Sequence, residues 1–81
     1  MNTEFLINQL SKEFPACFGR SEISSLTGGL IAGGTLANLA VAGEGPPFLR
    51  LGKKTVYEKE TFLKWLESRM KEESSEEVEH V

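Results

Sequence analysis

The sequence predicts one small domain that is mostly α-helical and carries a single β-hairpin, in the order α-α-α-β-β-α. Three observations support this fold class. Apolar residues recur at helical spacing near both ends of the chain. Two glycine pairs, Gly28-Gly29 and Gly33-Gly34, separate two short helical segments. Gly52-Lys53 joins two short apolar runs, as in a two-residue hairpin turn.

Charge divides the chain into two parts. The 81 residues carry a net charge of −3, yet five of the twelve acidic residues lie in the last ten positions, where Lys and Arg are absent. Residues 1–71 are therefore mildly basic and form the predicted domain. Residues 72–81 have little apolar surface to bury and much like charge, so we expect a disordered acidic tail.

Cysteine content and hydropathy indicate the compartment. Cys17 is the only cysteine, so no internal disulfide can form, and we expect it to be a small buried apolar residue. No run of apolar residues is long enough to cross a bilayer, and the N-terminus lacks the pattern of a signal peptide. We expect a cytoplasmic protein that does not contact a membrane.

The first predicted helix covers residues 2–13 and ends before Pro15, because the residue preceding a proline avoids helical angles. Phe5 lies beside the apolar stripe, so this helix either covers the core or also forms a contact between copies. Residues 15–19 are expected to be a connector. The apolar stripe of the first predicted helix consists of Leu6, Ile7, Leu10 and Phe14.

Two short helices follow. Ser21 is expected to cap the first, which ends near Thr27 at the first glycine pair. Leu30 and Ile31 are expected to fill the space between the helices. The second helix covers roughly residues 34–42, with Thr35 capping or opening it. Its inward residues are Leu36 and Leu39, while Ala37, Asn38 and Val41 lie nearer the outside.

The predicted hairpin spans residues 48–57. Its register pairs Phe48 with Tyr57, Leu49 with Val56, Arg50 with Thr55 and Leu51 with Lys54. Because side chains alternate along a strand, Leu49, Leu51 and Val56 share one face, which we expect to be buried. Arg50 and Thr55 share the other face, which we expect to meet a ligand.

The last predicted helix covers residues 58–71, with acidic residues at its start and basic residues near its end, as the helix dipole favours. Its apolar stripe assigns Trp65 to the core rather than to a ligand-stacking surface. The stripe consists of Phe62, Trp65, Leu66 and Met70.

No catalytic or cofactor site is visible in the sequence. The only histidine, His80, lies in the tail, and aspartate is absent, so neither a catalytic triad nor a metal site is expected. The glycine pairs do not form a phosphate-binding loop, because Thr35 follows Gly34 without the lysine that such a loop needs. We expect no enzyme activity, no cofactor and no small-molecule substrate.

The predicted order of two helices around a tight turn, a basic hairpin and a supporting helix is that of a winged helix-turn-helix domain. Arg50, Lys53 and Lys54 give the hairpin its positive charge, although a merely solvated hairpin tip would have the same composition. Several short motifs, from Leu26 to Glu67, also resemble those of the excisionase-type, MerR-like winged-helix proteins of phages and bacterial mobile elements. These are Leu26-Thr27-Gly28-Gly29, Thr35-Leu36-Ala37-Asn38, Gly43-Glu44-Gly45-Pro46-Pro47, Gly52-Lys53-Lys54 and Trp65-Leu66-Glu67.

The resemblance implies binding to double-stranded DNA, as a recombination directionality factor or as a transcriptional regulator. The recognition helix, about residues 34–42, would enter the major groove, and the hairpin, residues 48–57, would lie on the backbone or in the minor groove. The implied DNA-binding residues are Gly34, Thr35, Asn38, Arg50, Lys53 and Lys54.

An alternative function remains open. The second half of the recognition helix carries Ala40, Val41 and Ala42, where the family commonly has polar or basic residues. Small apolar residues suit contact with another protein. The chain could therefore be an interaction or dimerisation module that has kept the winged-helix fold and lost sequence-specific DNA contact.

Overall fold

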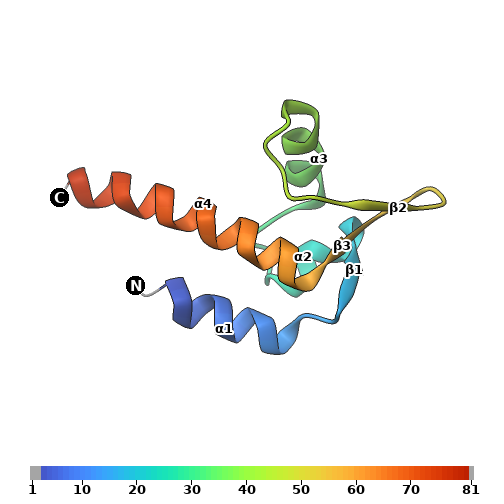
Figure 1. Cartoon of the computed structure of the whole chain (residues 1–81), viewed down its shortest axis with the longest axis horizontal. Helices are drawn as coiled ribbons and strands as arrows, with labels where there is room; N and C mark the ends of the chain where they lie inside the picture. The colour runs from blue at the N-terminus through green and yellow to red at the C-terminus, as the bar shows by residue number, and fades with distance from the viewer. Residues whose placement is uncertain (1–2, 81) are drawn as a thin grey trace.

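The computed structural model of the chain describes the backbone of residues 3–80 and the side chains of residues 3–72. Four helices and a three-stranded antiparallel sheet make up the fold, so the mostly helical prediction is confirmed, with one strand more than expected (Figure 1). The elements are α1 (Thr3–Glu13), β1 (Cys17–Gly19), the 3-10 turn η1 (Arg20–Glu22), α2 (Ile23–Leu26), α3 (Gly33–Ala42), β2 (Leu49–Leu51), β3 (Lys54–Glu58) and α4 (Lys59–His80).

The sheet has the order β1-β3-β2, with β3 at its centre. The prediction that residues 15–19 form only a connector was wrong, because Cys17–Gly19 pairs with β3 and Phe18 lies opposite Tyr57. Cys17 is exposed rather than buried, since its neighbour Phe18 takes the inner face of this short strand.

The hairpin has the predicted register but faces the other way. Leu49 lies opposite Val56, Arg50 opposite Thr55 and Leu51 opposite Lys54. Leu49 and Leu51 are 71% and 72% exposed, whereas Thr55 is 9% exposed. Tyr57 determines which face of the hairpin is buried. Its ring is 1% exposed and belongs to the core, and Thr55, two residues earlier, points to the same side. The expectation that Leu49, Leu51 and Val56 form the buried face was therefore wrong.

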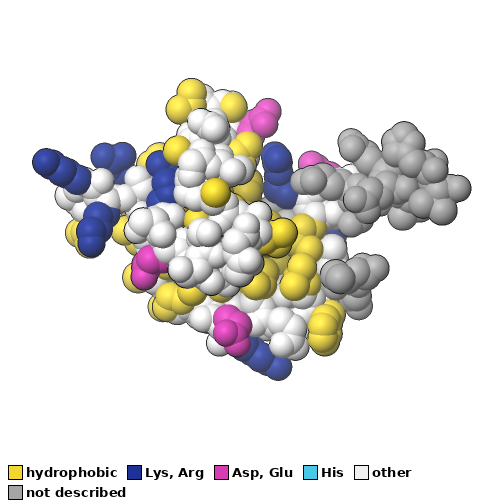
Figure 2. All heavy atoms as spheres, turned by 180° about the vertical axis from the view of Figure 1, so that it is seen from behind, with side chains coloured by type: hydrophobic (Ala, Val, Ile, Leu, Met, Phe, Trp, Pro, Cys, Tyr) yellow, Lys and Arg dark blue, Asp and Glu magenta, His cyan; other side chains and the backbone are white. Residues whose placement is uncertain are grey.

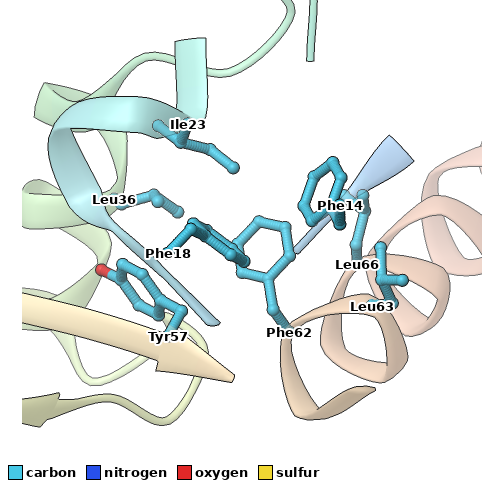
Figure 3. Packing of buried hydrophobic residues seen from close by; sticks show 8 residues of the cluster. All are labelled: Phe14, Phe18, Ile23, Leu36, Tyr57, Phe62, Leu63 and Leu66. Carbon is cyan, nitrogen blue, oxygen red and sulfur yellow. The ribbon is translucent and has the colours of Figure 1, made fainter. Parts of the chain in front are cut away.

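Aromatic rings from three elements form the centre of the core. Phe18 of β1 lies between Tyr57 of β3 and Phe62 of α4, with ring centroids 5.7 Å and 5.1 Å away (Figure 3). Tilted and edge-on contacts of this kind add stability beyond the burial of area. Ile23 and Leu36 are fully buried beside these rings, so α2 and α3 share the same core.

Helix α1 runs antiparallel to α4 and packs along it (Figure 1). Phe14, just past its end, is buried in the core, and Ile7 and Leu10 pack against the cluster, as their spacing predicts. Phe5 lies off the stripe and is 61% exposed. Lys59 connects the two helices, since its Nζ donates to the Ser11 carbonyl at 3.3 Å.

The turn between α2 and α3 depends on Thr27. Its hydroxyl donates to the Ile23 carbonyl at 2.8 Å and accepts from the Ile31 amide at 3.1 Å. Gly28 and Gly29 follow with φ angles of +64° and +87°, which side chains disfavour. Leu30 is 70% exposed, so it does not fill the space between the helices as expected.

Helix α3 begins one residue earlier than predicted. Ala32 occupies the N-cap position and Thr35 lies inside the first turn, so Thr35 does not cap the helix. The helix ends at Gly43, whose φ is +75°, and the Glu44 amide then donates to the Leu39 carbonyl at 2.9 Å. Trp65 Nε1 donates to the Glu44 carbonyl at 3.0 Å and fastens this end of α3 to α4.

Helix α4 extends to His80, past the Lys71 boundary expected from its apolar stripe. The side chains from residue 73 onward lie outside the described residues, so the disorder predicted for residues 72–81 stays a prediction. Trp65 packs against the core as expected but is only half-buried. Within the described part of the chain, no helix has both the length and the apolar character needed to cross a membrane.

Phe62 and Phe5 provide a matched pair for testing the core. Phe62 is fully buried, so Phe62→Ala should lower the free energy of unfolding by about 3–5 kcal/mol, close to the whole stability of such a small domain. Phe5→Ala removes the same atoms from an exposed position and should change it by less than about 0.5 kcal/mol. Urea unfolding followed by circular dichroism measures both. Equal effects of the two substitutions would contradict the assignment of the core.

Candidate nucleic-acid interface

A concave pocket of about 520 Å³ lies where α3, η1 and the tip of the hairpin meet. It forms because β3 is longer than β1. The strand β1 pairs only with residues 56–58, so the edge of β3 at Lys54 and Thr55 has no neighbouring strand there. The chain leaves β1 through η1 and returns as α3, which closes the other side.

Gly33 allows α3 to approach η1 closely. A Cβ atom at this position would lie 3.1 Å from the Arg20 carbonyl oxygen, tighter than most Cβ contacts in proteins. The first turn of α3 therefore packs directly on the backbone that leaves β1. This contact places Gly33 and Gly34 beside Arg20 in the wall of the pocket.

The hairpin tip supplies positive charge. Lys53 and Lys54 line the pocket, and Arg50 is exposed on the neighbouring strand. Figure 2 shows Lys and Arg side chains gathered around this projecting end of the molecule. Glu67 and Lys71 form an ion pair on α4, whereas Arg50, Lys53 and Lys54 have no ion-pair partner within the described part of the chain. The hairpin cations are thus available for an external anion.

The N-terminus of α3 is a second source of positive potential in the pocket. No side chain caps this helix, and the first amides with backbone partners are those of Thr35 and Leu36, which donate to the Ala32 carbonyl. Gly33 and Gly34 line the pocket. Free amides and the helix dipole at such a terminus favour a negatively charged ligand.

Thr55 contributes a neutral hydrogen-bonding group. It lines the pocket from the inner face of β3 and is 9% exposed, yet its hydroxyl has no hydrogen-bond partner among the described residues. Among the described residues, no side-chain polar atom is both buried and unpaired, so the unpaired hydroxyl of Thr55 is open to the pocket. A ligand oxygen in the pocket would pair with it.

Arg20 is a charged pocket residue that sequence reasoning missed. Its Nε donates to the Tyr57 hydroxyl at 2.9 Å, and its guanidinium lies 5.8 Å from the ring centroids of both Tyr57 and Phe48. These contacts hold the cation in place beside the pocket that it lines. Only the pairing of β1 with β3 reveals this role, because Arg20 and Tyr57 are far apart in the sequence.

The structure brings together half of the six residues predicted from the sequence. Gly34, Lys53 and Lys54 line the one pocket. Asn38 is exposed on α3, and Arg50 is exposed on β2 beside Thr55 without lining the pocket.

Thr35 lies apart from these residues. It borders a separate cavity of about 350 Å³ between α3 and α4, together with Trp65 and Arg69. The rest of the exposed face of α3 is apolar, with Val41 90% exposed.

Comparison of the chain with protein-family models, with curated proteins and with solved structures finds no match. Among the described residues, no cluster of His, Cys, Asp and Glu side chains could hold a metal ion. The chemistry of this site must therefore be inferred from its own residues, which offer cations, amides and one hydroxyl.

Two threonines test whether the Thr55 hydroxyl is kept for a ligand. Thr55→Val preserves the shape of the side chain and removes a hydroxyl without a partner, so the free energy of unfolding should be unchanged or slightly higher. Thr27→Val removes a hydroxyl with two backbone partners and should cost about 1–3 kcal/mol. Chemical denaturation measures both variants. A large loss of stability for Thr55→Val would mean that the hydroxyl serves the fold.

Proposed function

We propose that this chain is a winged helix-turn-helix protein that binds double-stranded DNA. In this proposal α2, the Thr27 turn and α3 form the helix-turn-helix unit, and the β2–β3 hairpin forms the wing. The observation that carries the proposal is the shared pocket, which places Lys53 and Lys54 beside the uncapped first turn of α3.

The chemistry of the pocket suits a phosphate of the DNA backbone. Lys53 and Lys54 supply charge, Gly33 and Gly34 supply amides at a helix N-terminus, and no acidic side chain lines the pocket. Half or more of the hydrogen bonds between proteins and DNA go to phosphates and sugars, and they come from these kinds of donor. A phosphate seated here would hold α3 against the major groove and the hairpin against the adjacent backbone.

Base reading by α3 would be limited. Asn38 is exposed in the middle of the helix and can form paired hydrogen bonds with adenine. Val41 and Ala42 can offer only apolar contact, for example with a thymine methyl group. Affinity would then come mainly from phosphate contacts, with strong dependence on salt and a modest preference for sequence.

The resemblance to excisionase-type, MerR-like proteins supports a role for this binding in recombination or transcription. Such a protein acts by occupying or shaping a DNA site rather than by catalysis. A recombination directionality factor and a small transcriptional regulator use the same kind of contact, so the pocket supports both roles equally.

One observation favours a second candidate function. Val41 is 90% exposed and Ala42 is exposed beside it, so α3 presents an apolar face. Exposed apolar surface of this kind suits a protein partner. A domain that bound a protein through α3 would keep the fold without the salt-dependent DNA affinity that the pocket predicts.

Substitution of the hairpin lysines tests DNA binding. The double substitution Lys53→Ala with Lys54→Ala should weaken binding to duplexes of any sequence, because phosphate contacts carry no sequence information. The plot of the logarithm of the association constant against the logarithm of the salt concentration should also become less steep by about 2. This is the value expected for two lost phosphate contacts. Fluorescence anisotropy with a random duplex at several salt concentrations measures both quantities.

The matched control is Lys12→Ala with Lys64→Ala. These lysines are exposed on α1 and α4, away from the pocket, and their removal lowers the net charge by the same amount. This variant should keep most of the affinity and the salt slope. Equal losses in the two double variants would show that the hairpin has no particular role, and an absence of DNA binding by the unmodified protein would favour the second candidate function.

A further inference from the structure

The face of the sheet opposite α3 carries apolar residues that no other described residue covers. Leu49 and Leu51 are 71% and 72% exposed, and Val56 lies between them and β1 on the same face. In most antiparallel sheets the face that does not meet the core is polar. These residues, with Lys54 and Glu58, form what we call the outer face.

The apolar residues border a hollow on this face. A shallow cavity of about 260 Å³ lies between Leu49, Val56 and the start of α4 at Thr61. Contiguous exposed apolar residues of this kind mark interaction sites in soluble proteins. A single exposed leucine would need no explanation, but here the exposed residues are adjacent in the sheet.

The charges on the outer face have a self-complementary arrangement. Along β3 the outward residues are Lys54, Val56 and Glu58, because Thr55 and Tyr57 between them face inward. A cation and an anion therefore flank an apolar centre, about 13 Å apart along the strand. The Glu58 carboxylate is held in position, since its Oε1 accepts a hydrogen bond of 2.6 Å from the Thr61 hydroxyl.

We propose that the outer face binds a second copy of this chain. A two-fold axis that passes beside Val56, perpendicular to the strands, stacks the two β3 strands antiparallel. Lys54 of each copy then lies opposite Glu58 of the other, and the apolar side chains pack between the two ion pairs. An interface formed by the same patch on both copies is the usual arrangement in homodimers.

The dimer leaves most of the proposed DNA-binding surface free. Arg50, Thr55 and α3 lie on the inner side of the sheet, whereas the contact uses the outer side. Lys54 is shared by the two surfaces, because it belongs to the outer side in the alternation of β3 and also borders the pocket at the hairpin tip. The face is small for a stable interface, so the dimer forms at high protein concentration. Two copies held on one duplex would associate more readily, because each raises the effective concentration of the other.

Charge reversal tests self-association in the absence of DNA. A failure of the dimer proposal can therefore be told apart from a failure of the proposed DNA binding. Sedimentation equilibrium over a concentration series should show a mass rising from 8.9 kDa toward twice that value. Lys54→Glu alone and Glu58→Lys alone should each weaken self-association at least tenfold, since each places like charges in contact. The double variant Lys54→Glu with Glu58→Lys restores the opposite-charge pairs and should restore the dimer.

Two further variants separate this geometry from general charge or folding effects. Lys53→Glu makes the same charge change in the turn, outside the outer face, and should leave the association constant within about threefold. Leu49→Asp should abolish the dimer while circular dichroism shows an intact fold. A protein that stays monomeric at every concentration would overturn the proposal. A double variant that associates no more tightly than the single variants would also overturn it. A dimer unaffected by Leu49→Asp would do the same, because the contact would then lie elsewhere, for example on α3.

Discussion

The burial of Tyr57 is the constraint on which the rest of the structure depends. Its ring packs 5.7 Å from both Phe18 and Phe62, and its hydroxyl accepts a hydrogen bond from Arg20. Because side chains alternate along β3, this one buried ring directs Thr55 toward α3. It also directs Leu49, across the hairpin, to the opposite side. The pocket and the outer face both follow from it.

The two proposals therefore assign a different partner to each side of the sheet. The inner side carries cations, free helix amides and the hydroxyl of Thr55 around one pocket, a set of groups that favours phosphate. The outer side carries apolar residues between one cation and one anion, a set that favours a copy of itself. A protein of this size has a thin core. Under the two proposals, copies joined through the outer sides of their sheets would add their weak DNA contacts together.

Much of this fold follows from local patterns in the sequence. The glycines after α2 and α3, the apolar stripe of α4 and the register of the hairpin depend on neighbouring residues, and all are as expected. The features that were missed depend on contacts between distant residues. The strand β1 is only three residues long and becomes visible when Phe18 pairs with Tyr57. The alternation of Leu49 and Leu51 resembles a buried face, but the larger aromatic ring of Tyr57 takes the core, and Arg20 joins the site only through that ring.

The most direct test of the account is a titration of isotope-labelled protein with a short DNA duplex, followed by amide chemical shifts in solution NMR. The inward direction of Thr55 and the shared pocket predict that Gly34, Lys53 and Thr55 shift together. Residues on the other side of the sheet, such as Cys17 and Leu49, should stay unchanged at protein concentrations too low for self-association. Shifts confined to Cys17 and Leu49, or no shifts with any duplex at low salt, would contradict the account.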